Sequence, residues 1–161
     1  YGAASFVSRK VGKLSEQDVM NVLGIARKDF NVDPDRIYLL GHSMGGGGAL
    51  HLGMKYPELW AALGPIAPAI YSSPKDLVKI RHIPIICIQG AKDKLVKASG
   101  TRRWIAKMKE LEMEHQYIED PEGGHVIIAF QKMPDIFKFF NKHTRKPAGE
   151  KKAEKKEASS R

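Results

Sequence analysis

Three side chains in this sequence could together activate a hydroxyl group as a nucleophile, and each follows a predicted strand. Ser43 lies in a Gly-His-Ser-Met-Gly motif at residues 41–45, Asp93 follows an apolar run, and His125 follows two glycines. A serine hydroxyl becomes strongly nucleophilic when an imidazole takes its proton and a carboxylate holds that imidazole in the required tautomer. The chain order serine, acid, histidine predicts Ser43 as nucleophile, Asp93 as acid and His125 as base.

The motif at residues 41–45 predicts a sharp turn from a strand into a helix. Strand and helix approach closely in such a turn, so Gly41 and Gly45 are expected to lack side chains for steric reasons. The backbone N–H of Met44, at the start of the helix, is expected to face a developing oxyanion. His42 is expected to point away from Ser43. The structural alternative is a tight turn without chemistry.

Other interpretations apply to the acid, the base and the residues around them. Asp93 could instead cap the following helix, and loop histidines such as His125 are usually incidental. Four residues are predicted to line a pocket for the acyl or alcohol group of a substrate: His42, Trp60, Pro68 and Tyr71.

The elements that must position these residues alternate between helices and strands. Helical spacing of apolar residues predicts helices at 15–30, 45–56, 104–111 and 135–142. Apolar runs predict strands at 37–40, 59–66, 84–89 and 115–118, and residues 70–80 receive no assignment. Such alternation indicates a parallel sheet covered on both faces, with chemistry at the carboxyl ends of the strands.

Composition limits the classes of function. The chain has 161 residues, 42% of them hydrophobic, and no apolar run long enough to span a bilayer. Residues 1–146 are predicted to form one folded domain and 147–161 a disordered Lys/Glu-rich tail. Nearly half of the net charge of +9 belongs to residues 143–161, so no nucleic-acid partner is predicted. The single cysteine, Cys87, is expected in the core, and neither a metal nor a cofactor is predicted.

Residues from about 15 to 143 resemble the C-terminal two-thirds of an α/β-hydrolase-fold esterase. The segment at 32–46 is similar to the nucleophile region of bacterial carboxylesterases, feruloyl-esterase and polyhydroxybutyrate-depolymerase-like enzymes, and prolyl-oligopeptidase-like hydrolases. The resemblance implies a three-layer α/β sandwich with a mostly parallel sheet. It also implies Ser43, Asp93 and His125 as catalytic triad, Met44 as an oxyanion donor and a small-molecule ester as substrate.

The sequence departs from this family before the nucleophile. Family members carry several strands there and a His-Gly-Gly loop with a second oxyanion donor, and no such segment precedes Ser43. We therefore expect a sheet of about four strands that lacks the N-terminal strands, completed by a missing segment of a longer protein or by a second chain.

Three alternative functions remain open at this point. The first is an inactive or weakly active hydrolase fragment that acts as a binding module, and the second is a peptidase of the same fold. The third is a nucleotide-binding domain, because the glycines at 45–48 open a helix, although no Gly-Lys-Ser/Thr ending follows them.

Overall fold

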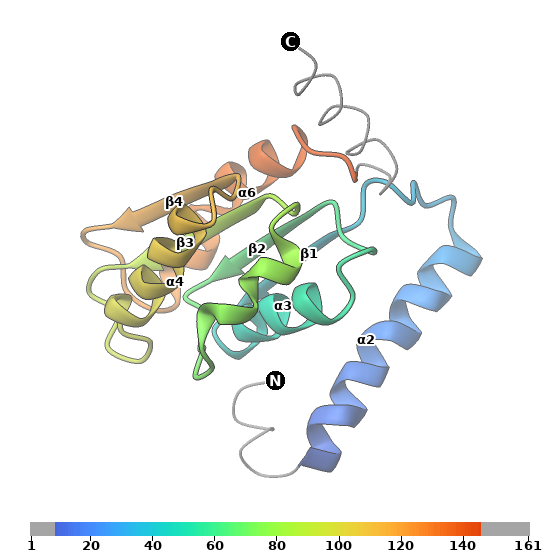
Figure 1. Ribbon diagram of the computed structural model, residues 1–161, viewed down its shortest axis with the longest axis horizontal. Helices are drawn as coiled ribbons and strands as arrows, with labels where there is room; N and C mark the ends of the chain where they lie inside the picture. Colours follow the sequence, from blue (N-terminus) through green and yellow to red (C-terminus); the bar gives the residue numbers. More distant parts are fainter. Residues whose placement is uncertain (1–8, 146–161) are drawn as a thin grey trace.

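The computed structural model describes residues 9–145, and its centre is a sheet of four parallel strands (Figure 1). The strands pair in sequence order and are β1 (Tyr38–His42), β2 (Ala62–Ile66), β3 (Ile85–Gly90) and β4 (His115–Asp120). All three pairings are parallel. The predicted parallel sheet is confirmed. The carboxyl ends of all four strands therefore lie on the same side of the sheet. The tail predicted at 147–161 lies outside the described residues.

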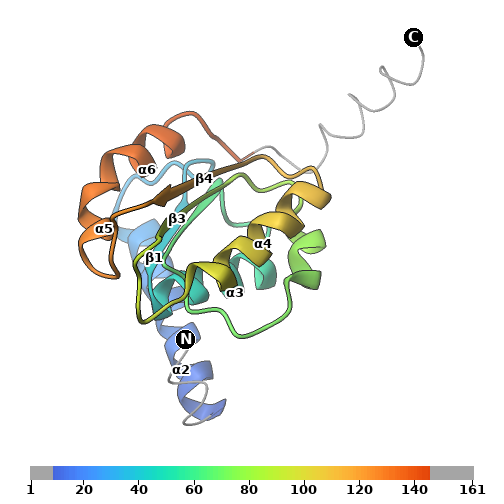
Figure 2. The ribbon, with the colours of Figure 1, turned by 90° about the vertical axis from the view of Figure 1, so that its left-hand side faces the viewer.

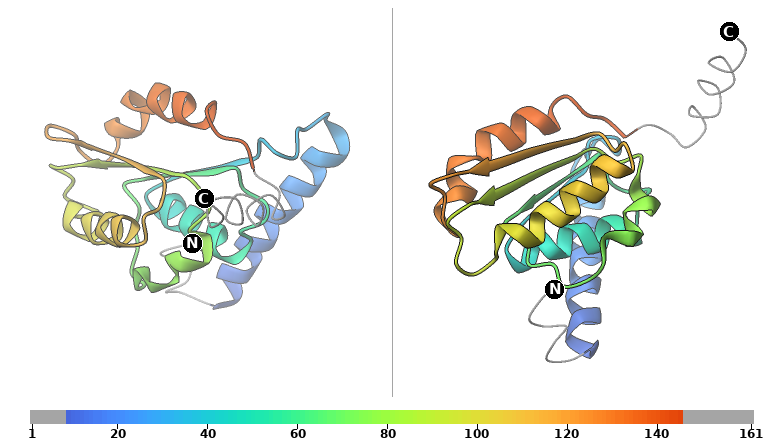
Figure 3. Two further views of the ribbon diagram at one scale, coloured as in Figure 1. Left: turned by 45° about the horizontal axis from the view of Figure 1, so that its top comes forward. Right: turned by 60° about the vertical axis from the view of Figure 1, so that its left-hand side comes forward.

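Helices cover both faces of this sheet (Figures 2 and 3). One face carries α3 (Met44–Lys55), the 3-10 helix η1 (Pro74–Ile80) and α4 (Ala98–Glu110), and the other carries α5 (Ile127–Gln131) and α6 (Met133–Phe140). Along β3, Ile85 and Cys87 belong to the core under α3 and α4, whereas Ile86 and Ile88 belong to the core under α5 and α6. Alternating side chains thus build two apolar layers, as a three-layer sandwich requires.

Two short helices were not predicted, because they contain too few residues to show the helical periodicity of apolar side chains. η1 occupies the unassigned segment, and it begins where the Ser73 side chain accepts a hydrogen bond from Lys75 N, with Pro74 in the first turn. α5 has five residues, and Lys132 alone separates it from α6. Among the described residues, no helix has the length and apolar character needed to cross a membrane.

The first described helix, α2 (Arg9–Asp29), projects to one side of the sandwich (Figure 1). It begins at Arg9, so the predicted start at Ser15 is wrong. Polar contacts tie it to the end of α3: Glu16, only 9% exposed, accepts hydrogen bonds from the Lys55 ammonium and from the Tyr56 hydroxyl at 2.5 Å. The hydrogen bond that Lys55 donates to Glu16 raises the pKa of Lys55 above its ordinary value.

The apolar stripe predicted for α2 is buried only in part. Val19 and Leu23 pack against the core under α3, but Val22 is 65% exposed and Phe30 is 71% exposed. The prediction of a helix from the apolar spacing is therefore confirmed. The expectation that all apolar residues of the stripe face a core is wrong, because Val22 and Phe30 are exposed.

The strand that precedes Ser43 is less buried than its apolar sequence predicted. β1 pairs with β2 alone among the described strands, and Leu40 on it is 37% exposed. In contrast, every residue of β3 is buried between two neighbouring strands. On one face of β1, Tyr38 stacks on Phe140 of α6 with ring centroids 4.6 Å apart. The apolar run predicts burial on both faces, together with a bare edge where preceding strands are lacking, and Leu40 is exposed because an edge strand lacks one flank.

At the opposite edge, a polar cluster ties β4 to α4. Glu119 accepts hydrogen bonds from Arg102 Nε at 2.9 Å and from the Tyr117 hydroxyl at 2.6 Å. These bonds lower the pKa of Glu119 to about 2, with the bond from Arg102 as the largest cause. Ionised Glu119 therefore stabilises the folded state at neutral pH.

This stabilisation should depend on pH in a defined direction. Because folding lowers the pKa of Glu119, its contribution is complete above about pH 4.5 and is lost as the pH falls toward 2. We expect Glu119→Gln to lower the free energy of unfolding at pH 7 by about 1–2 kcal/mol, discounted for solvent screening, and to differ little from wild type near pH 2.

Urea unfolding at several pH values measures this difference. Glu112→Gln is the matched control, because the Glu112 side chain is 82% exposed in its pair with Arg81. A constant difference between wild type and Glu119→Gln from pH 7 to pH 2 would contradict the assignment.

Candidate active site

Ser43 occupies a strained turn between β1 and α3. Its φ of 57° and ψ of −116° lie in a region that L-residues rarely adopt, at a cost of about 1–3 kcal/mol. Three backbone hydrogen bonds hold the turn: Ser43 N donates to Ile66 O at 2.9 Å, and Ser43 O accepts from Gly47 N at 3.1 Å and Ala69 N at 2.9 Å. β2 and its following loop therefore impose the backbone conformation that presents the hydroxyl.

The two glycines of the motif are not equivalent. A Cβ on Gly41 would lie 2.1 Å from Gly45 O, whereas a Cβ on Gly45 would meet nothing within 4 Å. The steric expectation is confirmed for Gly41 and wrong for Gly45, because the crowding falls on the strand side of the turn. Gly47 packs against the loop after β2, with 2.4 Å from a Cβ there to Ala69 O. This close packing favours a structural role for Gly47 over a phosphate cradle.

Asp93 lies in the loop of residues 91–97 between β3 and α4, which we call the acid loop. Its Oδ1 accepts hydrogen bonds from Leu95 N and Val96 N, both at 2.8 Å, and its Oδ2 accepts from His125 Nδ1 at 2.6 Å. Burial disfavours the charged carboxylate, but these hydrogen bonds outweigh it and hold the pKa of Asp93 below its ordinary value. Asp93 does not cap α4, whose N-cap residue is Lys97.

A buried amide, missed in the sequence, supports the acid loop. Gln89, 0% exposed at the end of β3, donates through Nε2 to Val96 O at 3.0 Å. Its Oε1 accepts a hydrogen bond from Thr101 Oγ1 on α4 at 2.7 Å. The signal available in the sequence was a polar residue inside an otherwise apolar strand, because such a residue must find partners when buried.

His125 lies in the loop of residues 121–126 between β4 and α5, which we call the base loop. Its Nε2 is 2.9 Å from Ser43 Oγ, on the opposite side of the ring from the bond to Asp93. A carboxylate only accepts hydrogen bonds, so Nδ1 carries the proton, and Nε2 of the neutral ring accepts from the Ser43 hydroxyl. The structure thus joins Ser43, His125 and Asp93 in one hydrogen-bonded series that can move a proton from oxygen to nitrogen.

The end of β3, where the acid loop begins, meets the base loop at a pair of glycines. A Cβ on Gly90 would lie 2.4 Å from Gly123 O, and a Cβ on Gly123 would lie 2.9 Å from the Asp120 side chain. Lys92 N donates to Gly123 O at 3.0 Å, which fixes one loop against the other. This contact sets the separation between Asp93 and His125.

His42 does not point away from the site, contrary to the sequence expectation. Its ring lies against the His125 ring with centroids 4.7 Å apart and a tilt of 44°. Its Nε2 is 2.8 Å from the backbone oxygen of His125. Because a carbonyl oxygen only accepts, Nε2 of His42 must carry a proton and donate it to this bond.

The remaining predicted site residues fall in different places. Trp60 precedes β2, is 3% exposed and donates from Nε1 to Leu52 O at 3.2 Å, so its assignment to the substrate pocket was wrong. Pro68 is buried in the loop after β2, and Tyr71 is 72% exposed beyond it. Met44 is the first residue of α3. Pocket roles for His42, Pro68 and Tyr71 and an oxyanion role for Met44 stay predictions.

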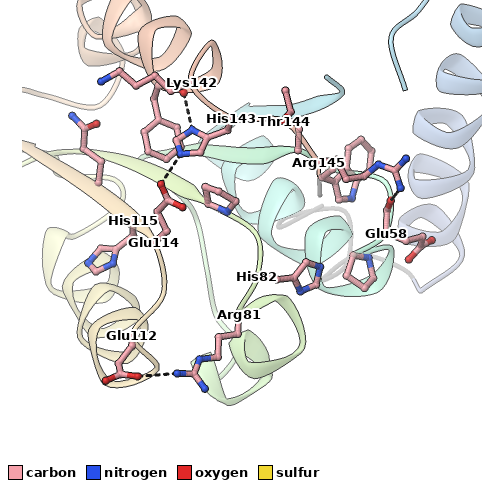
Figure 4. Close-up of a pocket in the computed structure, with 16 residues that line it drawn as sticks. Glu58, Arg81, His82, Glu112, Glu114, His115, Lys142, His143, Thr144 and Arg145 are labelled. Carbon is pink, nitrogen blue, oxygen red and sulfur yellow. Dashed lines mark hydrogen bonds and ion pairs between the residues drawn. The ribbon is translucent and has the colours of Figure 1, made fainter. Parts of the chain in front are cut away.

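A separate hollow of about 1160 Å³ opens at the amino ends of the strands, away from Ser43 (Figure 4). Trp60 lines it, and its charges pair within it, as Arg81 with Glu112 at 2.9 Å and His143 with Glu114 at 2.7 Å. Among residues 9–145, no group of three or more His, Cys, Asp or Glu side chains is arranged to hold a metal ion.

Comparison with known proteins gives one family match. A family model described as "Putative esterase" matches residues 20–140. The protein described as "Putative esterase NocK" from Nocardia uniformis subsp. tsuyamanensis is 36% identical over 69 residues, which are 43% of this chain and 20% of NocK.

Solved structures show the same fold. A thermostable esterase, at 24% identity and a TM-score of 0.72, matches 81% of this chain and 37% of its own. SOBER1 of Arabidopsis thaliana, at 15% identity and a TM-score of 0.67, matches 84% of this chain and 65% of its own. The chain therefore spans a fifth of NocK and about two-thirds or less of these two structures.

The glycine contact between the two loops gives a test of the site geometry. We expect Gly90→Ala to force the loops apart, lengthen the bond between Asp93 and His125, and lower the free energy of unfolding by about 1–3 kcal/mol. The proton on Nδ1 of His125 should give a downfield NMR signal in wild type that moves upfield or broadens in the variant.

Gly100→Ala is the matched control, because a Cβ on Gly100 in α4 meets nothing within 4 Å. This change should leave the NMR signal in place and stabilise the helix by about 0.5–1 kcal/mol. An unchanged signal in Gly90→Ala would show that the glycine contact does not set the geometry.

Proposed function

The chain belongs to the esterase family of α/β-hydrolases, and on that basis we propose that it hydrolyses a carboxylic ester through an acyl-enzyme on Ser43. The observation that carries the proposal is the series of hydrogen bonds from Asp93 through His125 to Ser43, at 2.6 and 2.9 Å. We assign Ser43 as nucleophile, His125 as general base and Asp93 as the carboxylate that orients the base.

The first half of the reaction acylates the serine. Ser43 Oγ attacks the ester carbonyl carbon as its proton passes to His125 Nε2, and a tetrahedral oxyanion forms. Asp93 stabilises the imidazolium, because its lowered pKa keeps it ionised at neutral pH. The backbone N–H of Met44, at the positive end of α3, is the donor that we assign to the oxyanion. His125 then gives the proton to the alcohol oxygen, which leaves as the carbon–oxygen bond breaks.

The second half releases the acid and restores the serine. A water molecule gives a proton to His125 Nε2 and attacks the acyl carbon, forming a second tetrahedral intermediate. This intermediate collapses with release of the carboxylic acid, and the proton returns from His125 to Ser43 Oγ. The proton transfers in both halves involve only Ser43, His125, Asp93, water and the ester.

The strain at Ser43 supports the same role. A backbone conformation that costs about 1–3 kcal/mol persists only where its surroundings enforce it, and such conformations concentrate at functional sites. Here β2 and its loop enforce it through two backbone hydrogen bonds to Ser43, and α3 adds a third from Gly47 N. An ordinary tight turn at this point would be better served by glycine at position 43.

A fluorophosphonate probe tests the nucleophile directly, because only an activated serine reacts with it. We expect wild type to be labelled at Ser43 and to hydrolyse short-chain nitrophenyl esters. Ser43→Ala should abolish labelling and lower ester hydrolysis by about 10³-fold or more. Ser99→Ala, at an exposed position of α4, is the matched control and should behave as wild type. Equal rates for wild type and Ser43→Ala would refute the nucleophile assignment.

The acid is tested by an isosteric change. Asp93→Asn should lower kcat by about 10³–10⁴-fold with little change in KM, because an amide in this place stabilises neither the correct tautomer nor the imidazolium. Asp76→Asn, at an exposed position of η1, serves as control. Retention of wild-type kcat by Asp93→Asn would remove Asp93 from the mechanism.

A further inference from the structure

We propose that His42 is a positioning residue that holds the base loop, and with it His125, over Ser43. The inference rests on the proposed function, since it concerns the delivery of the base to the nucleophile. It assigns a role to a histidine that the three-residue mechanism does not use. The observations that carry it are the hydrogen bond from His42 Nε2 to His125 O at 2.8 Å and the ring contact at 4.7 Å.

The sheet topology creates the need for such a residue. Ser43 follows β1 and His125 follows β4, and these are the two edges of a sheet ordered β1-β2-β3-β4. At about 4.8 Å between neighbours, the two edge strands lie about 14 Å apart. The base loop must therefore return across the carboxyl ends of the inner strands to bring Nε2 within 2.9 Å of Ser43 Oγ.

The contacts that hold His125 divide between the two sides of the site. On the side of β3, Asp93 accepts from Nδ1 at 2.6 Å, and Lys92 N donates to Gly123 O at 3.0 Å. On the side of β1, the base is bonded by Ser43 and by His42. The bond to Ser43 is lost whenever Ser43 is acylated, because the ester oxygen carries no proton. The bond from His42 persists, since it uses a backbone oxygen that takes no part in the reaction.

The geometry separates this role from that of a second base. His42 Nε2 already carries a proton and donates it to a carbonyl oxygen, so this nitrogen has no lone pair to accept the proton of Ser43. The tilted ring contact also limits rotation of the His125 ring. His42 therefore acts on the position of the base, through the backbone oxygen and the ring face of His125.

Two substitutions separate the hydrogen bond from the ring contact. His42→Phe keeps an aromatic ring but removes the donor, whereas His42→Gln keeps an N–H donor but removes the ring. The readout is the second-order rate constant of fluorophosphonate labelling, together with the fraction of protein labelled at completion. A displacement of the base of about 1 Å costs roughly 10²-fold in rate. We expect a rate constant 10- to 100-fold lower in His42→Phe with complete labelling, and recovery to within about threefold of wild type in His42→Gln.

Steady-state kinetics with a nitrophenyl ester give the second readout. A residue that positions the base should lower kcat in His42→Phe and leave KM within about twofold, because the base acts in the chemical step. His115→Phe is the matched control, since His115 opens β4 at the opposite end of the strand from the base loop. It should label and turn over at the wild-type rate.

Several outcomes would overturn the proposal. A wild-type rate constant in His42→Phe would show that the donor is not needed, and a His42→Gln variant as slow as His42→Phe would exclude the hydrogen bond as the cause. A smaller labelled fraction with an unchanged rate constant would indicate a role in folding alone. If His42→Phe fails to fold, His42→Leu replaces it in the comparison with His42→Gln. Failure of the proposed function is distinct, because wild type itself would then remain unlabelled.

Discussion

The active-site geometry depends on one topological constraint, which is that a loop leaving one edge strand must reach a serine at the other edge. Parallel pairing brings the carboxyl ends of β1 to β4 to the same side, but it leaves β1 and β4 about 14 Å apart. The base loop spans this distance beside the acid loop, and the crossing is possible because Gly90 and Gly123 carry no side chains where the end of β3 meets the base loop. Small residues therefore set the distances of the reactive ones.

The site also has to keep a buried carboxylate, that of Asp93, in its charged form. Asp93 is 6% exposed, and a carboxylate in such a place would ordinarily tend to protonate. Two backbone N–H groups of the acid loop and the Nδ1–H of His125 keep it ionised. The same bonds that stabilise the charge also fix the tautomer of His125, so the electrostatics and the proton position have one cause. Gln89 of β3 bonds both to the acid loop and to Thr101 on α4. It therefore holds the acid loop, and with it Asp93, against the sheet.

The sequence predicted the features that depend on local pattern. Apolar runs located the four strands, and the segments that follow three of them gave Ser43, Asp93 and His125. The errors concern spatial neighbours. Trp60 was assigned to the substrate pocket at the carboxyl ends of the strands, although a strand at 59–66 puts residue 60 at its amino end, and in the structure Trp60 precedes β2, which starts at Ala62. The contact of His42 with His125 joins residues 83 positions apart, and no pattern within a single strand or turn contains it. Burial of Leu40 and Phe30 was overestimated because an apolar stripe does not reveal what lies opposite it.

The three loops share a common arrangement that explains why local pattern succeeded as far as it did. Each reactive side chain is preceded, within one to three residues, by a residue that contacts another loop: His42 before Ser43, Gly90 before Asp93, and Gly123 before His125. Each segment is thus fixed to a neighbouring loop just before its reactive residue. Because only one to three residues separate the contact from the reactive side chain, the backbone has little freedom to displace that side chain. The residues next to each reactive side chain therefore help to position it. Because these residues contact one another in pairs, the effects of substituting two of them on the rate of ester hydrolysis should not be additive.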